Sequence, residues 1–126
     1  MSTAKARRLL IADDDPELID AYVLFFEAYG HVTQTAVDGV GALAIYNTWR
    51  PDVVMLDIQM PRMDGHAVAR EIRRMSVIPR PLLLAVTALR APSERVESFR
   101  VGFDHHFVKP AQLPSILAAI ASSTII

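Results

Sequence analysis

Three carboxylates, one hydroxyl and one ammonium each stand directly after a short apolar run. Asp13 and Asp14 follow Leu-Leu-Ile-Ala, Asp57 follows Val-Val-Met-Leu, Thr87 follows Leu-Leu-Leu-Ala-Val, and Lys109 follows Phe-Val. Two carboxylates ~4 Å apart repel by about 4 kcal/mol at an effective dielectric near 20. A hard divalent cation offsets that repulsion, and Mg²⁺ binds few carboxylates while keeping waters and phosphate oxygens. These residue types indicate a site for a metal beside an oxyanion, if the fold brings them together.

Asp57 is the best candidate for the reacting group, because it ends the clearest buried run of the chain. An aspartate can attack phosphorus and form an aspartyl-phosphate. Asp13 and Asp14 would hold the cation, with the backbone carbonyl of Gln59 as a third ligand. The ammonium supplies a point-like positive charge, and the hydroxyl supplies a donor that rotates to suit. Phosphoryl transfer needs mainly positioning and charge neutralisation, which these groups provide.

The apolar runs must be strands for these groups to meet. They are short, rich in Val, Leu and Ile, and separated by amphipathic stretches with helix start and stop signals. Strands that alternate with helices form βαβ units with right-handed crossovers, so all strands point the same way and their polar ends share one edge. The sequence predicts an α/β fold, a doubly wound five-stranded parallel sheet. The expected strands are residues 8–12, 31–36, 52–57, 81–86 and 105–108.

The helices are predicted from their terminal residues. Asp15 precedes Pro16 as an N-cap, Asp38 caps the second helix, and Gly30 and Gly102 end helices. The expected helices are residues 16–30, 38–49, 65–75, 92–102 and 113–122. The spacing predicts an apolar face for the first helix that consists of Leu18, Tyr22, Phe25, Phe26 and Tyr29. For the second helix it predicts Val40, Leu43 and Ala44, with Tyr46 or Trp49.

Length and composition exclude several classes of protein. The 126 residues fit one domain, 1–126. Because the net charge is −1, the release of counterions from a phosphate backbone would not favour binding, and we expect no direct contact with nucleic acid. Because cysteine is absent, disulfides, thiolate metal sites and a cysteine nucleophile are excluded. No apolar run approaches the roughly 20 residues that cross a membrane. We therefore expect a cytoplasmic protein without a membrane partner.

Four segments together resemble the receiver domain of two-component response regulators over nearly the whole chain. They are residues 9–16 (LLIADDDP), 52–65 (DVVMLDIQMPRMDG), 83–88 (LLAVTA) and 107–110 (FVKP). The resemblance implies the flavodoxin-like receiver fold with strand order 2-1-3-4-5. It also implies a phosphoacceptor domain whose phosphoryl group comes from a phosphohistidine on a sensor histidine kinase or a histidine phosphotransfer protein.

The resemblance assigns a role to each residue at the sheet edge. Asp57 is the phosphoacceptor. Asp14 binds Mg²⁺ directly and Asp13 largely through water, together with Asp57 and the carbonyl of Gln59. The resemblance further implies that the domain catalyses its own phosphorylation and dephosphorylation and is not a turnover enzyme on a small substrate.

The resemblance also implies a switch. Thr87 and Lys109 contact the phosphoryl oxygens, the Lys109–Pro110 peptide is cis, and an unknown downstream protein reads the fourth helix, fifth strand and fifth helix. Receivers usually carry Tyr or Phe three residues before the lysine, where this chain has His106. We hypothesise that His106 still rotates inward, with a smaller packing gain and with pH sensitivity near pH ~6.5.

Two alternatives remain open from the sequence. A pseudo-receiver would bind its partner without phosphorylation, and the intact acid set argues against it. A haloacid-dehalogenase-like phosphatase also uses an aspartate nucleophile, but that family needs a second Asp two residues later, where this chain has Gln59.

Overall fold

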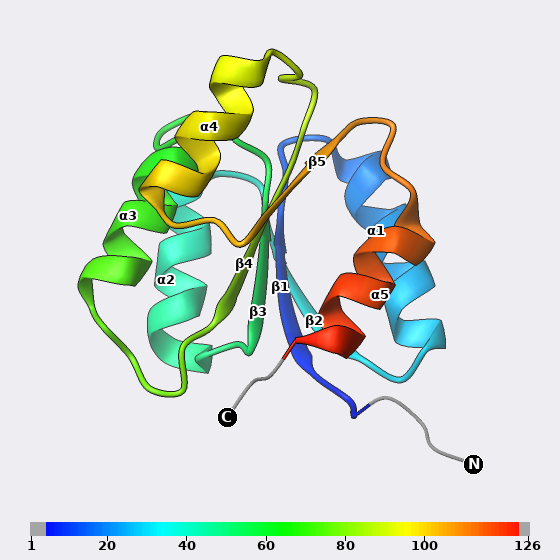
Figure 1. Ribbon diagram of the computed structural model, residues 1–126. Coiled ribbons are helices and arrows are strands. Elements are labelled where there is room, and N and C mark those ends of the chain that lie inside the picture. The colour runs from blue at the N-terminus through cyan, green and yellow to red at the C-terminus, as the bar shows by residue number, and fades with distance from the viewer. Residues whose placement is uncertain (1–4, 124–126) are drawn as a thin grey trace.

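The computed structural model describes residues 5–123 and contains one parallel five-stranded sheet in the order β2-β1-β3-β4-β5 (Figure 1). This confirms the predicted fold class and strand order. Three strands differ from the expected ranges: β2 begins one residue later, β3 is one residue shorter at each end, and β4 is shifted by one residue toward Thr87. The strands are β1 (Arg8–Ala12), β2 (Val32–Ala36), β3 (Val53–Leu56), β4 (Leu82–Thr87) and β5 (His105–Val108).

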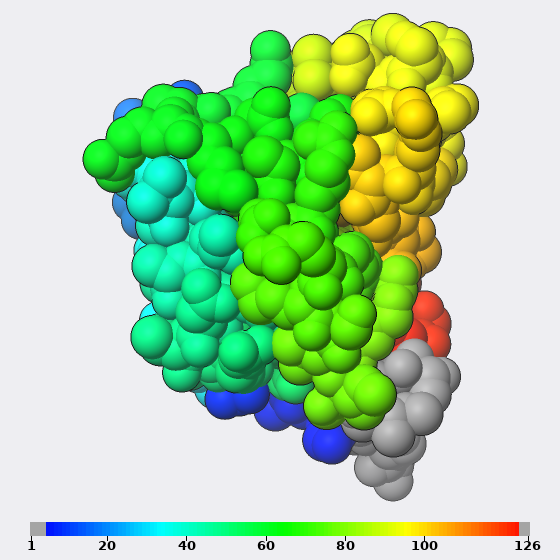
Figure 2. Space-filling model, turned by 90° about the vertical axis from the view of Figure 1, so that its left-hand side faces the viewer, coloured from blue at the N-terminus to red at the C-terminus, as the bar shows by residue number. Residues whose placement is uncertain are grey.

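Five helices cover the two faces of the sheet. They are α1 (Pro16–Ala28), α2 (Gly39–Trp49), α3 (Gly65–Arg74), α4 (Pro92–Val101) and α5 (Leu113–Ser122). Helices α1 and α5 lie on one face, and α2, α3 and α4 lie on the other (Figure 1). Figure 2 shows α3 in the middle of the second face, with α2 on one side and α4 and β5 on the other. Two cores result, one on each side of the sheet.

The central strands are buried on both faces, which explains their unbroken apolar sequences. Leu10 belongs to one core, and its neighbours Leu9 and Ile11 belong to the other. In the register of the sheet, Ala12 of β1 lies beside Leu56 of β3. The residues that follow these two positions therefore leave the sheet side by side.

Aspartates begin three of the helices. Asp15 accepts hydrogen bonds from the amides of Glu17 and Leu18, and Asp38 accepts one from the amide of Gly41. Both caps were predicted. Asp64 caps α3 through the amide of Ala67, and this role was not predicted. Each such cap stabilises its helix by about 1 kcal/mol.

The predicted apolar face of α2 is partly wrong. Val40 is half exposed and Ala44 is exposed, while Ala42 and Tyr46 are buried. The reason is the close approach of α2 to the loop after β3, since a Cβ on Gly39 would lie 1.9 Å from the carbonyl oxygen of Met63. That contact turns positions 39, 42 and 46 toward the core. Position 40 is rotated by about 100° from position 39 around the helix axis and therefore points toward solvent.

The predicted apolar face of α1 differs from the observed buried face at two residues. Tyr22 and Phe26 are buried as expected, and Leu18 and Phe25 pack against the same core. Tyr29 is 59% exposed because α1 ends at Ala28. Ile19 is buried and was not predicted.

Candidate functional site: an acidic cluster at the carboxyl edge of the sheet

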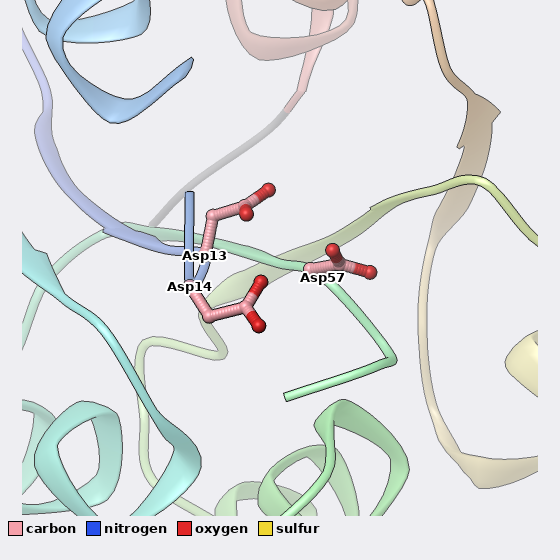
Figure 3. A group of neighbouring side chains, drawn as sticks. All are labelled: Asp13, Asp14 and Asp57. Carbon is pink, nitrogen blue, oxygen red and sulfur yellow. The ribbon is translucent and has the colours of Figure 1, made fainter. Parts of the chain in front are cut away.

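Asp13, Asp14 and Asp57 meet where β1 and β3 end (Figure 3). One carboxylate oxygen from each lies within 4.8 Å of the others. Asp13 and Asp57 are buried, whereas Asp14 is exposed to solvent. Two of the acids therefore form the floor of the site, and the third lies at its mouth.

Lys109 lies inside this cluster. Its ammonium nitrogen is 2.7 Å from Oδ2 of Asp13 and 2.8 Å from Oδ2 of Asp57. Burial lowers the pKa of Lys109, but the hydrogen bonds to the two carboxylates outweigh it, and the pKa rises to about 12. The ammonium therefore stays charged at any physiological pH.

The second oxygen of each buried carboxylate accepts from the backbone. Oδ1 of Asp13 accepts from the amide of Asp15 at 2.9 Å, and Oδ1 of Asp57 accepts from the amide of Gln59 at 3.1 Å. Burial nevertheless raises the pKa of Asp13 above its ordinary value, against the lowering effect of its hydrogen bonds. Burial therefore makes the ionised form of Asp13 less favourable in the folded protein than in water.

The site fits Mg²⁺ by its chemistry. Three carboxylates and one ammonium leave a surplus of two negative charges among the four groups, all of whose acceptor atoms are oxygens. Mg²⁺ prefers oxygen donors and one or two direct carboxylates, and it keeps several waters. The exposed carboxylate of Asp14 offers a direct ligand that a hydrated cation can reach from solvent.

Thr87 is buried at the end of β4, the strand next to β3. Its hydroxyl accepts a hydrogen bond from the amide of Leu89 at 3.3 Å. The Lys109–Pro110 peptide is cis, as predicted, and a second cis peptide at Ile78–Pro79 was not predicted.

His106 is buried on β5 and bonded at both ring nitrogens. Nε2 lies 3.0 Å from the carbonyl oxygen of Leu89, and Nδ1 lies 2.7 Å from the hydroxyl of Ser98 on α4. Ser98 was not predicted from the sequence. The available signal was its position, because α4 buries Ser98 and Val101 on the side that packs against the sheet.

The family model described as response regulator receiver domain matches residues 9–121. The chain belongs to this family. It is 34% identical over 113 residues to the DNA-binding dual master transcriptional regulator RpaA of Synechocystis sp., covering 90% of this chain and 47% of that protein. It is 37% identical over 112 residues to the response regulator MprA of Mycobacterium sp. strain KMS, covering 88% of this chain and 47% of that protein.

Solved receiver structures share the fold of this chain at lower sequence identity. The receiver domain of Francisella response regulator 1452 has a TM-score of 0.85 at 27% identity, with 90% of this chain and 93% of that chain covered. The chemotaxis response regulator CheY4 of Vibrio cholerae has a TM-score of 0.85 at 27% identity, with 92% and 99% covered. The receiver chain spans about half the length of the curated relatives named above. Among residues 5–123, no helix is long and apolar enough to span a membrane.

Proposed function

We propose that this receiver is a phosphoacceptor and that Asp57 takes a phosphoryl group from a phosphohistidine. The observation that carries the proposal is the contact of one ammonium, that of Lys109, with two buried carboxylates, Asp13 and Asp57. A structural ion pair needs one acid for one base. Two buried acids and a third within 4.8 Å of them keep a negative surplus that serves a cation and an incoming phosphoryl group.

In the proposed reaction an oxygen of Asp57 attacks phosphorus, an O–P bond forms and the P–N bond to the donor imidazole breaks. The leaving imidazole keeps the electron pair of that bond and takes up a proton. Lys109, bonded to Oδ2 of Asp57, is placed to move its hydrogen bond to a phosphoryl oxygen. The amide of Gln59 holds Oδ1 of Asp57 and so fixes the orientation of the carboxylate.

The proposed metal ligands are Asp14, Asp57 and the carbonyl of Gln59, with Asp13 acting largely through water. When bound, Mg²⁺ supplies charge neutralisation for the transferring phosphoryl group. The surplus negative charge of the cluster supports this assignment.

The proposed donor is a sensor histidine kinase or a histidine phosphotransfer protein. After transfer, Thr87 donates to a phosphoryl oxygen, and a separate downstream protein reads the surface of α4, β5 and α5, in which His106 takes the switch position. We propose a cytoplasmic location for this receiver, because one related regulator is named as DNA-binding and therefore works where DNA is. That the receiver itself makes no direct contact with nucleic acid remains a prediction from its net charge of −1.

The test is mass spectrometry after incubation with phosphoramidate and Mg²⁺. We expect a phosphate adduct on the wild type and on Asp20→Asn, an exposed acid of α1, and none on Asp57→Asn. An adduct that persists in Asp57→Asn, or none on the wild type, would contradict the proposal. The second result would favour a phosphorylation-independent pseudo-receiver.

A further inference from the structure

The imidazole of His106 connects two elements that are separate in the sequence. Its Nε2 contacts the Leu89 carbonyl in the loop between β4 and α4, and its Nδ1 contacts the Ser98 hydroxyl within α4. Ser98 is fully buried and His106 is 6% exposed. Water therefore has little access to either contact, and a buried polar group that loses its partner is costly.

The chemistry of the partners fixes the proton positions. A carbonyl oxygen can only accept, so Nε2 of His106 must carry a hydrogen that it donates to Leu89. In the neutral imidazole Nδ1 is then an acceptor, and the hydroxyl of Ser98 donates to it. Ser98 thereby selects the tautomer that holds the Leu89 carbonyl.

The same loop residue also contacts Thr87. The amide of Leu89 donates to Oγ1 of Thr87, and its carbonyl accepts from His106. A continuous hydrogen-bonded path therefore runs from Thr87 through Leu89 and His106 to Ser98. Arg95, one turn earlier on α4, adds a second contact by donating to the backbone carbonyl of His106 at 3.3 Å.

We infer that Ser98 is a positioning residue of the receiver switch, which it serves by holding His106 on the Leu89 carbonyl so that movement of Thr87 is transmitted to α4 through hydrogen bonds. The inference rests on the proposed phosphoacceptor function. When phosphorylation displaces the Oγ1 atom of Thr87 toward a phosphoryl oxygen, the amide of Leu89 must follow or lose its acceptor. Because the ring of His106 is held at both ends, the loop and α4 move together without the inward rotation of the ring that the sequence suggested.

The switch in this receiver then works through hydrogen bonds rather than through the steric fit of a ring. A free aromatic ring signals by entering or leaving a space, whereas a ring bonded at both nitrogens must break two hydrogen bonds to rotate. The missing phenol hydroxyl of the usual tyrosine is matched here by a hydroxyl from α4, that of Ser98.

The first measurement is the tautomer of His106 in the free wild-type protein, from the nitrogen chemical shifts of the imidazole. We expect a proton on Nε2 and an unprotonated Nδ1. A neutral ring with its proton on Nδ1 would overturn the inference, because Nε2 would then have no hydrogen for Leu89. This measurement needs no phosphorylation, so it is independent of the proposed function.

The second measurement uses beryllofluoride, a mimic of the phosphoryl group, together with Mg²⁺. It compares the changes in backbone amide chemical shifts that this addition causes in the wild type and in Ser98→Ala. We expect the changes at Asp57 and Thr87 to be preserved in the variant and those along α4 to fall by at least half. Ser98→Thr keeps the hydroxyl and should retain the wild-type response. Equal α4 changes in Ser98→Ala and the wild type would overturn the inference.

A double-variant cycle separates the relay from simple loss of packing. In a His106→Phe background the ring offers no nitrogen, so adding Ser98→Ala should leave the α4 response unchanged. A further drop in that background would show that Ser98 acts by packing and would overturn the inference. If the wild type shows no change at Asp57 with beryllofluoride, the phosphoacceptor function fails instead.

Discussion

Lys109 places its ammonium nitrogen 2.8 Å from the Oδ2 atom of Asp57, across 52 residues of chain. The contact joins the ends of β5 and β3, which are not neighbours in the sheet because β4 lies between them. The side chain of Lys109 therefore reaches over the end of β4 to the carboxylate. The ammonium of Lys109 therefore lies where the proposed phosphoryl group on Asp57 would carry its negative charge.

Replacing Lys109 should affect metal binding and phosphorylation in opposite directions. In Lys109→Met the cation that lies among Asp13 and Asp57 is gone, so its repulsion of a divalent ion is gone too. A +1 and a +2 charge ~5 Å apart repel by about 1.7 kcal/mol even at the dielectric of water. We expect Mg²⁺ to bind about tenfold more tightly by calorimetry, while phosphorylation of Asp57 slows by about a hundredfold or more. Weaker binding of Mg²⁺ by the variant would contradict this account of the charge balance.

The raised pKa of Asp13 predicts an unusual pH dependence of stability. Burial is the main cause, and the folded protein therefore holds the proton more readily than the unfolded chain, whose Asp titrates near 3.8. Between 3.8 and the raised folded pKa, the free energy of unfolding falls as the pH rises. Above that window the ionised carboxylate destabilises the fold.

Asp13→Asn should remove this contribution while Lys109 keeps Asp57 as a partner. In urea denaturation without Mg²⁺, we expect the variant to be more stable than the wild type at neutral pH, by up to about 1 kcal/mol. Its stability should vary less across the acid window. A variant with the same pH slope as the wild type would show that another group titrates there.

Arg62 adopts a left-handed backbone conformation, φ 67°, and pairs with the buried carboxylate of Asp38. Arg62→Ala loses the ion pair and keeps the backbone strain, so we expect a loss of about 1 kcal/mol in the free energy of unfolding. Arg62→Gly loses the same pair but relieves a conformation that costs other residues about 1 kcal/mol. Chemical denaturation should therefore place the Gly variant about 1 kcal/mol above the Ala variant.

A control for Arg62 is Arg74→Ala, which removes an exposed arginine and its ion pair with Glu71 within α3. Its effect on stability should be smaller than that of Arg62→Ala, because solvent screens an exposed ion pair. Equal stability of the Gly and Ala variants at position 62 would mean that the left-handed conformation carries no cost.

His66 has a buried Nε2 atom without a hydrogen-bond partner among the described residues. Its ring packs toward Phe103, with 6.3 Å between the ring centroids. Because an unsatisfied buried nitrogen costs about 1–3 kcal/mol, an apolar ring of similar shape should be favourable. We expect His66→Phe to raise the free energy of unfolding by about 1 kcal/mol in thermal or urea denaturation. A loss of stability would show that Nε2 is satisfied in solution.

The sequence by itself determined the order of strands and helices, the caps Asp15 and Asp38, and the polar residues that end the strands. These features are local, since apolar runs, capping residues and strand ends depend on periodicity and backbone hydrogen bonds near each position. The resemblance to receivers then supplied the strand order and the cis peptide before Pro110, both of which the structure confirms.

Only the tertiary structure decided which side chains are partners. The inward face of α2 depends on how closely Gly39 approaches Met63, and that approach is set by packing between distant segments. His106 alone gave no sign that Ser98 would supply a hydroxyl, because the contact requires α4 to lie against β5 at one particular rotation. Side-chain hydrogen bonds form over about 3 Å. Their partners are therefore fixed by the relative positions of whole elements, which a local sequence pattern does not encode.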